Sequence, residues 1–167
     1  MSDRIKISNW DERYADTGYL FGTTPNDFLK SVADRLAPNS RVLCLADGEG
    51  RNGVYLATLG HKVTAVDQSR VGLEKANKLA EQKQISIKTV NADLAEYNLG
   101  VESWDCIVSI FFHIPRALRA CIYPRIMAAL KPGCILILES YTPEQLSYST
   151  GGPPTSDLML TKDELAQ

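Results

Sequence analysis

The chain has 167 residues, of which 44% are hydrophobic, and this is typical of one soluble globular domain. Eighteen basic residues against twenty acidic residues give a formal charge of −2, which argues against nucleic acid and anionic membranes as partners. No apolar run reaches the roughly 18 residues that a membrane span needs, and the charged N-terminus lacks the apolar core of a signal peptide, so we expect a cytoplasmic protein.

The first 37 residues predict a lid followed by a helix. Residues 9–25, NWDERYADTGYLFGTTP, are polar and punctuated by glycine, and they carry the aromatic residues Trp10, Tyr14, Tyr19 and Phe21. Residues 25–37 follow with a helical pattern that places Pro25 near the first turn. We expect the aromatic segment either to close over a ligand, with its rings against a cation, or to pack along the edge of a sheet.

From residue 41 onward, short apolar runs rich in β-forming residues alternate with helical patterns. We expect strands at 41–46, 62–66, 85–90, 104–110 and 133–139. The helices between them are expected from the glycine loop to Leu59, from Ser69 to Lys83 and over 115–130, where Pro124 should kink or split the helix. This alternation predicts a Rossmann-like doubly wound α/β fold with a mostly parallel sheet, in one domain over 1–167 whose core is 41–139.

Four cysteines are present, and none of them forms a C-x-x-C pair. Three lie inside the apolar runs that are expected to be strands, where a free cysteine behaves as a small buried hydrophobe. We therefore expect no metal site.

The glycine loop is the first sign of a ligand. In VLCLADGEGRNGVYLA, residues 42–57, the glycines Gly48, Gly50 and Gly53 spell G-x-G-x-x-G between a strand and a helix. Ligands of open parallel sheets bind at such a position, because glycine allows close approach to the backbone. Asp67 ends the second strand nineteen positions after Gly48, the spacing at which a carboxylate accepts hydrogen bonds from ribose hydroxyls. The two features predict a nucleoside-containing ligand, and an ordinary tight turn is the alternative.

Acidic residues around the loop favour S-adenosylmethionine over a nicotinamide dinucleotide. Asp47 and Glu49 would repel a pyrophosphate but suit a sulfonium and an α-amino group. Asp93, after the third strand, is placed to accept from an adenine amino group, and we expect no separate substrate domain. A fragment of an NAD-dependent oxidoreductase and a non-catalytic nucleoside-binding module remain the alternatives.

The run from VLCLADGEGRN to AVDQS resembles the first two motifs of class I S-adenosylmethionine-dependent methyltransferases. GEGRN, WDERY and PNDFL resemble the branch related to tellurite-resistance and thiopurine methyltransferases, and the resemblance covers residues 9–163. It implies S-adenosylmethionine as cofactor, S-adenosylhomocysteine as product, and as acceptor a small soft nucleophile such as a thiol or a selenium or tellurium compound.

The sequence departs from this family's acid-x-Gly-x-Gly-x-Gly pattern at two positions. Cys44 stands in the place of the acid and Ala46 in the place of the first glycine, so we expect Asp47 to bind the methionine amino group. The predicted cofactor-binding residues are Trp10, Ala46, Asp47, Gly48, Gly50, Asn52, Asp67, Gln68, Ala92, Asp93, Leu94 and Ser109.

The acceptor is expected near the end of the fourth strand. The candidate pocket residues are Phe111, His113 and Arg116 of SIFFHIPRALR, together with Tyr14 of the lid, and Glu139 and Tyr141 are weaker candidates. His113 either lines the site or marks the entry of a helix, whereas His61 is expected to be structural. Arg116 and Arg119 either offer charge to an oxyanion or are solvated. An acceptor that is already anionic needs positioning and no general base, so no residue is assigned as catalytic.

Residues 140–167 are expected to form a loop and the start of a helix capped by Thr161. The resemblance implies two further strands after that helix. Without them the fifth strand would be an exposed edge, which favours a homodimer.

Overall fold

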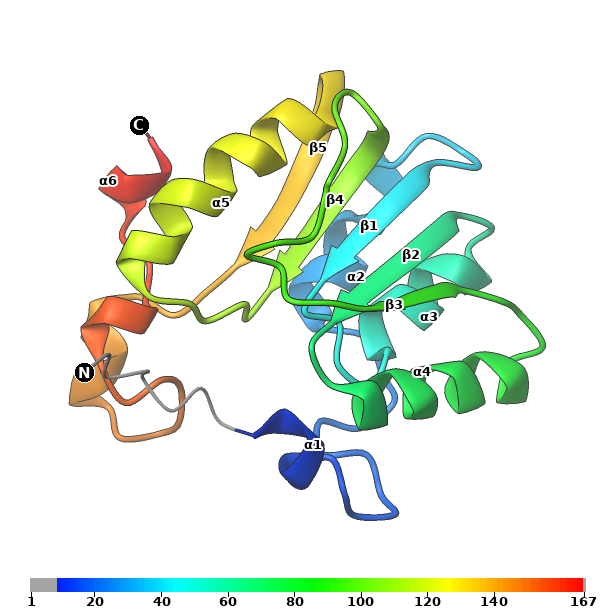
Figure 1. Ribbon diagram of the computed structural model, residues 1–167, viewed down its shortest axis with the longest axis horizontal. Helices are drawn as coiled ribbons and strands as arrows, with labels where there is room; N and C mark the ends of the chain where they lie inside the picture. Colours follow the sequence, from blue (N-terminus) through cyan, green and yellow to red (C-terminus); the bar gives the residue numbers. More distant parts are fainter. Residues whose placement is uncertain (1–8, 167) are drawn as a thin grey trace.

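The computed structural model describes residues 9–166, and these form one parallel sheet between layers of helices (Figure 1). The strands are β1 (Arg41–Leu45), β2 (Lys62–Asp67), β3 (Lys88–Asn91), β4 (Trp104–Ile110) and β5 (Leu130–Glu139). They lie in the order β3-β2-β1-β4-β5, and every neighbouring pair is parallel. The chain therefore adds β2 and β3 on one side of β1, and then adds β4 and β5 on its other side. This confirms the predicted Rossmann-like doubly wound fold.

Strand β1 is apolar on both faces because helices cover both. Val42 and Cys44 belong to a buried cluster with α2 (Asp27–Val32) and α3 (Arg51–Thr58). Leu43 and Leu45 point the other way, into a cluster with α5 (Arg116–Ala129). A fourth helix, α4 (Arg70–Gln82), packs against α3 and β3. Burial on both faces is what a continuous apolar run in a parallel sheet indicates.

The helices follow most of the sequence signals. Ser69 caps α4 as predicted, since its Oγ accepts from the amide of Gly72 at 3.0 Å. The helix expected over 25–37 is shorter, because α2 ends at Val32 and a 3-10 turn, η1 (Ala33–Arg35), follows it. The predicted split at Pro124 is wrong: α5 runs unbroken through it, with Ile122 and Ile126 buried against the sheet on either side.

Two strands differ from the expected ranges at their starts. β3 begins at Lys88, since Ile85 before it packs among α3 and α4 instead of pairing. β5 begins three residues earlier than expected, at Leu130. Its register jumps from the pair Trp104–Leu130 to the pair Cys106–Ile135, so the Pro-Gly segment bulges out of the sheet.

Residues after β5 fold back as two 3-10 turns, η2 (Pro143–Ser147) and η3 (Ser156–Leu158), and a short helix, α6 (Lys162–Leu165). Thr161 begins α6 with a capping box to Glu164, as its sequence predicts. Figure 1 shows these residues and the N-terminal helix α1 (Trp10–Arg13) on the side of the sheet where the strands end. Within 9–166, β5 pairs with β4 alone, and the homodimer stays a prediction. No helix in this part of the chain is both long and apolar enough to cross a membrane.

Candidate functional site

The carboxyl ends of β2, β1 and β4 lie side by side. Leu45 pairs with Val66 of β2 and with Ser109 of β4, so Asp67 and Phe111 flank the glycine loop on its two sides. The chain reverses its direction of winding between β1 and β4, which is where open α/β sheets bind ligands. The fold thus brings the predicted cofactor and acceptor residues to one edge of the sheet.

The backbone of the glycine loop is left-handed at alternate positions. The φ angles are 50° at Ala46, 56° at Gly48 and 84° at Gly50. A residue with a side chain pays about 1–2 kcal/mol for this conformation, which explains why the related pattern has glycine where this chain has Ala46. Cys44, in the place of the family's acid, is buried in β1.

Asp67 is held against the glycine loop. One carboxylate oxygen accepts from the amide of Gly48 at 2.8 Å and the other accepts from the amide of Ser69 at 2.7 Å. Burial raises the pKa of Asp67, and these backbone bonds oppose the rise. A carboxylate has about four acceptor positions, so two remain for a ligand such as a ribose.

Asp47 turns toward the start of α3. Both carboxylate oxygens lie 3.2 Å from the amide of Gly53, which donates to them. A Cβ at residue 53 would lie 2.5 Å from the carboxylate, so the third glycine of the motif makes room for Asp47. Burial raises the pKa of Asp47 to about 7. Its binding of the methionine amino group stays a prediction.

Glu49 has a different role from the one that its sequence position suggested. Its carboxylate accepts from the amide of Leu20 at 2.7 Å and pairs with Lys75 at 2.7 Å, and Lys75 also donates to the carbonyl of Gly18. The charge of Glu49 is thus neutralised inside the protein. The argument from Glu49 against a pyrophosphate is therefore wrong, because this side chain anchors the N-terminal segment and does not face the ligand.

The N-terminal segment lies across the glycine loop. Asp11 accepts from the hydroxyl of Ser69 at 2.6 Å, and Trp10 stacks on Tyr14 with ring centroids 5.3 Å apart. Tyr14 is buried between Gly48 and Gly72, and its hydroxyl would lie 2.5 Å from a Cβ at Gly48. Tyr14 therefore lies over the glycine loop. It has no stacking contact with the other acceptor candidates.

The end of β3 lies next to Asp67, because the amide of Ala92 donates to the Asp67 carbonyl at 3.1 Å. Asp93 is exposed there, and its carboxylate accepts from the amide of Ala95 at 2.8 Å. Gln68 is exposed, whereas Leu94 and Ser109 are buried. The positions of Gln68, Asp93 and Leu94 beside Asp67 suit the adenine end of a nucleoside, whereas Ser109 lies on β4, across β1 from them. Their contacts with a ligand remain predictions.

Asn52 serves the fold. Its Oδ1 accepts from the amide of Asn26 at 2.9 Å, while the side-chain amide of Asn26 donates to Glu139 at 2.7 Å. This chain of bonds ties the start of α2 to the start of α3 and the end of β5. The predicted cofactor contact of Asn52 would have to share its oxygen with this bond.

Three rings gather at the ends of β4 and β5 and are called the aromatic cluster below. Phe111 stacks on Tyr141 at 5.0 Å, His113 stacks on Tyr141 at 5.6 Å, and Phe111 and His113 lie 5.9 Å apart. Nδ1 of His113 is buried without a hydrogen-bond partner. Burial lowers the pKa of His113, and hydrogen bonding to the backbone of Leu158 partly opposes this. Sequence reasoning could not place Tyr141 beside Phe111 and His113, because the stacking arises only when β4 and β5 pair.

Both candidate arginines are already paired. Arg116 and Arg119 each place a guanidinium nitrogen 3.1 Å from the same carboxylate oxygen of Glu164. Arg119 is buried and also donates to the carbonyls of Ile114 at 2.7 Å and Asp157 at 2.6 Å. Both arginines hold the C-terminal segment in place. Arg119 is therefore neither a solvated side chain nor a free ligand for an oxyanion, the two alternatives that the sequence left open.

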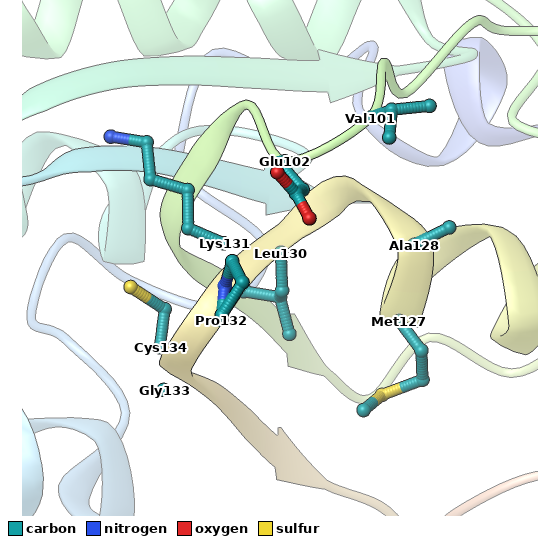
Figure 2. Close-up of a pocket in the computed structure, with 9 residues that line it drawn as sticks. All are labelled: Val101, Glu102, Met127, Ala128, Leu130, Lys131, Pro132, Gly133 and Cys134. Atoms are coloured by element: carbon teal, nitrogen blue, oxygen red, sulfur yellow. The ribbon is translucent and has the colours of Figure 1, made fainter.

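A surface hollow of about 470 Å³ lies elsewhere, at the start of β5 (Figure 2). Its lining residues are Val101, Glu102, Met127, Ala128, Leu130, Lys131, Pro132, Gly133 and Cys134. This is the opposite end of β5 from the aromatic cluster, and none of the predicted site residues lines it. We therefore place the site at the carboxyl ends of the strands on geometry.

Comparison with known proteins identifies the family of this chain. A family model described as a methyltransferase domain matches residues 42–133, more than half of the chain. The uncharacterized methyltransferase YbaJ of Bacillus subtilis is 33% identical over 109 residues, which are 64% of this chain and 38% of YbaJ. The probable S-adenosyl-L-methionine-dependent methyltransferase TehB of Haemophilus influenzae is 34% identical over 77 residues, 46% of this chain and 27% of TehB.

Solved structures show the same fold. The crystal structure of TehB from Haemophilus influenzae matches with a TM-score of 0.70 and 23% identity over 93% of this chain and 51% of that one. The sequence matches cover 38% of YbaJ and 27% of TehB, so this chain spans well under two thirds of the length of these curated relatives. Since the family model covers the glycine loop, Asp67 and the strands that carry them, the chain belongs to the methyltransferase domain family.

Proposed function

We propose that this chain binds S-adenosylmethionine at the ends of β1 and β2 and transfers its methyl group to a small soft nucleophile. The observation that carries the proposal is the bond between the Asp67 carboxylate and the Gly48 amide at 2.8 Å. It joins the two parts of the predicted nucleoside site, the turn after β1 and the acid after β2. The name of TehB, a probable S-adenosyl-L-methionine-dependent methyltransferase, supports the choice of cofactor.

The residues present fit this cofactor. Asp67 keeps acceptor positions for the ribose, and the glycine loop lies where the chain reverses its direction of winding, the position at which open α/β sheets bind ligands. Trp10 lies partly exposed at the N-terminal segment, and the guanidinium of Arg13 lies 4.3 Å from its ring centroid, so a sulfonium would have to replace this cation on the ring. When bound, the cofactor supplies an electrophilic methyl group. The protein orients the acceptor in line with it and excludes water.

The methyl acceptor is proposed to bind at the aromatic cluster. Soft, polarizable sulfur makes favourable contacts with aromatic rings, so Phe111 and Tyr141 suit a sulfur nucleophile. Selenium and tellurium compounds are the other members of the proposed class. We propose a small molecule as the acceptor, because a chain with a formal charge of −2 has no net positive charge to attract nucleic acid.

Calorimetric titration with S-adenosylhomocysteine tests the cofactor site. We expect binding to the unmodified chain and a loss of about 10–100-fold in affinity for Asp67→Ala, because hydrogen bonds to a charged group contribute about 1.5–3 kcal/mol. Glu81→Ala, an exposed acid on α4, is the matched control and should bind normally. Absence of heat with the unmodified chain, or equal affinity for Asp67→Ala, would refute the proposal. Binding of NADH in its place would favour the oxidoreductase alternative.

A further inference from the structure

The aromatic cluster is held in a strained conformation. Phe111 has a φ of 53°, which bulky residues rarely adopt. Its amide donates to the carbonyl of Glu139 at 2.9 Å, which fixes the strained turn to the end of β5. Such strain persists where the surrounding structure enforces it, and it is concentrated at functional sites. The turn presents the Phe111 ring to Tyr141 and His113.

His113 brings an unpaired nitrogen into this cluster. Among the buried side-chain nitrogen and oxygen atoms of residues 9–166, two lack a hydrogen-bond partner, and these are Nδ1 of His113 and Nδ1 of His61. His61 precedes β2, at the opposite end of the sheet from the glycine loop. Buried polar atoms are normally paired. The orphan atom of His113 lies at the end of β4, where the acceptor is expected, and it therefore marks a position for a ligand group.

The cluster suits an uncharged acceptor better than an oxyanion. Of the three arginines of the neighbouring helix α5, Arg116 and Arg119 pair with Glu164, and Arg125 donates to the carbonyl of Ala95. In the described part of the chain, no Lys or Arg stacks on Phe111, His113 or Tyr141. The loop after β5 closes over Tyr141, since a Cβ at Gly152 would lie 3.1 Å from that ring. Apart from the backbone of Leu158, the groups around His113 are thus aromatic and apolar.

We propose that His113 is a general base that removes the proton of a neutral thiol bearing an apolar or aromatic group. This rests on the proposed methyl transfer. The S–H proton passes to Nδ1 of His113, and the sulfur lone pair forms the new S–C bond to the methyl group. The bond between methyl and sulfonium breaks with its electron pair left on sulfur, which yields a thioether and S-adenosylhomocysteine. His113 then returns the proton to solvent.

Thiols that differ in acidity distinguish a general base at His113 from a histidine that only supports the fold. The full 167-residue chain is assayed for S-adenosylhomocysteine release with an alkanethiol, which is mostly protonated at neutral pH, and with a benzenethiol, which is largely ionised. We expect His113→Gln to lower the rate with the alkanethiol by at least about 100-fold, the usual size of general-base catalysis. The rate with the benzenethiol should fall by less than about tenfold, because this acceptor arrives without its proton.

His61→Gln is the matched control, because it removes the other buried histidine with an unpaired Nδ1. It should leave both rates unchanged, with the fold of both variants checked by circular dichroism. Equal losses for both thiols in His113→Gln would overturn the proposal, and so would turnover of selenite or tellurite in place of thiols. Titration with S-adenosylhomocysteine separates the two levels of failure. If the chain does not bind it, the proposed function fails; if it binds and no thiol is methylated, the role of His113 alone is refuted.

Discussion

At the scale of the residue, the glycines of the loop are required for different physical reasons. Gly50 combines a φ of 84° with close contact to α4, since a Cβ there would lie 2.5 Å from Cβ and 2.9 Å from Cα of Ala76. Gly53 has an ordinary helical position and makes room for a carboxylate. Gly48 lies under the hydroxyl of Tyr14. One sequence motif thus serves backbone conformation, helix packing and the placement of an acid.

Gly50→Ala should therefore be strongly destabilising. We expect a loss of about 2–4 kcal/mol in the free energy of unfolding, from the left-handed conformation and from overpacking against α4. Gly60→Ala is the control, because Gly60 has a φ of 91° and no atom within 4 Å of its Cβ position. It should lose only about 1 kcal/mol. Urea unfolding measures both, and equal losses would show that the contact with Ala76 relaxes at no cost.

Asp47 should make stability depend on pH near neutrality. Its pKa is raised from 3.8 to about 7 in the folded state, so the folded protein binds the proton more tightly than the unfolded chain. Its contribution to the free energy of unfolding therefore falls as pH rises from about 4 to about 7. Asp47→Asn removes this titration and keeps a side-chain oxygen that can accept from the Gly53 amide.

We expect Asp47→Asn to be more stable than the parent at pH 8 by about 1–4 kcal/mol, since one pKa unit corresponds to about 1.4 kcal/mol. The difference should shrink at pH 5 and disappear below about pH 4, the lower end of the window between the two pKa values. Urea unfolding at four pH values between about 4 and 8 measures it, with Asp93→Asn, an exposed carboxylate, as the control. A difference that is constant across this range would mean that Asp47 titrates normally.

At the scale of the element, the C-terminal segment depends on one buried arginine. Arg119 connects α5 to the carbonyl of Asp157 and to the carboxylate of Glu164, which also caps α6. The amide of Leu160 then donates to the carbonyl of Tyr141 at 3.0 Å, so the segment is fixed beside the aromatic cluster. Without Arg119, Glu164 keeps its pairing with Arg116, but the carbonyls of Ile114 and Asp157 lose their donor.

Arg119→Ala should release this segment. We expect a loss of about 2–4 kcal/mol in the free energy of unfolding and faster hydrogen exchange at Leu160 and Glu164. Arg116→Ala is matched to it, because Arg116 pairs with the same oxygen of Glu164 but its side chain is 72% exposed. That change should cost less than about 1 kcal/mol. Similar exchange in both variants would contradict a central role for Arg119.

The elements that the sequence predicts are those encoded by neighbouring residues. The apolar runs, the cap at Ser69, the glycine loop and the position of Asp67 all depend on short spacings, and the structure has each of them. The errors concern partners that are distant in the chain, such as Lys75 for Glu49 and Glu164 for Arg119. Short spacings cannot identify such partners, because they are chosen by packing. The same applies to the bulge in β5 and to the stacking of Tyr141.

At the scale of the whole molecule, two segments flank the site from opposite ends of the sequence. The N-terminal segment is tied to the glycine loop through Glu49 and Leu20, and the C-terminal segment is tied to α5 through Glu164. The two are anchored on different sides of the switch point between β1 and β4. Cofactor binding should therefore act on one of them and not on the other.

We expect S-adenosylhomocysteine to slow hydrogen exchange in the N-terminal segment and leave the C-terminal segment unchanged. The amides to follow are those of Leu20 and Gly48, which donate to Glu49 and Asp67, and that of Leu160 as the internal control. At a ligand concentration 100 times the Kd, binding stabilises the folded state by about 2.7 kcal/mol. Every amide that exchanges only through global unfolding is then protected by up to this amount, wherever it lies in the structure. The comparison is therefore made on amides that exchange locally. Protection of Leu160 equal to that of Leu20 would show that the two segments move together, and the division of the site into a cofactor side and an acceptor side would be wrong.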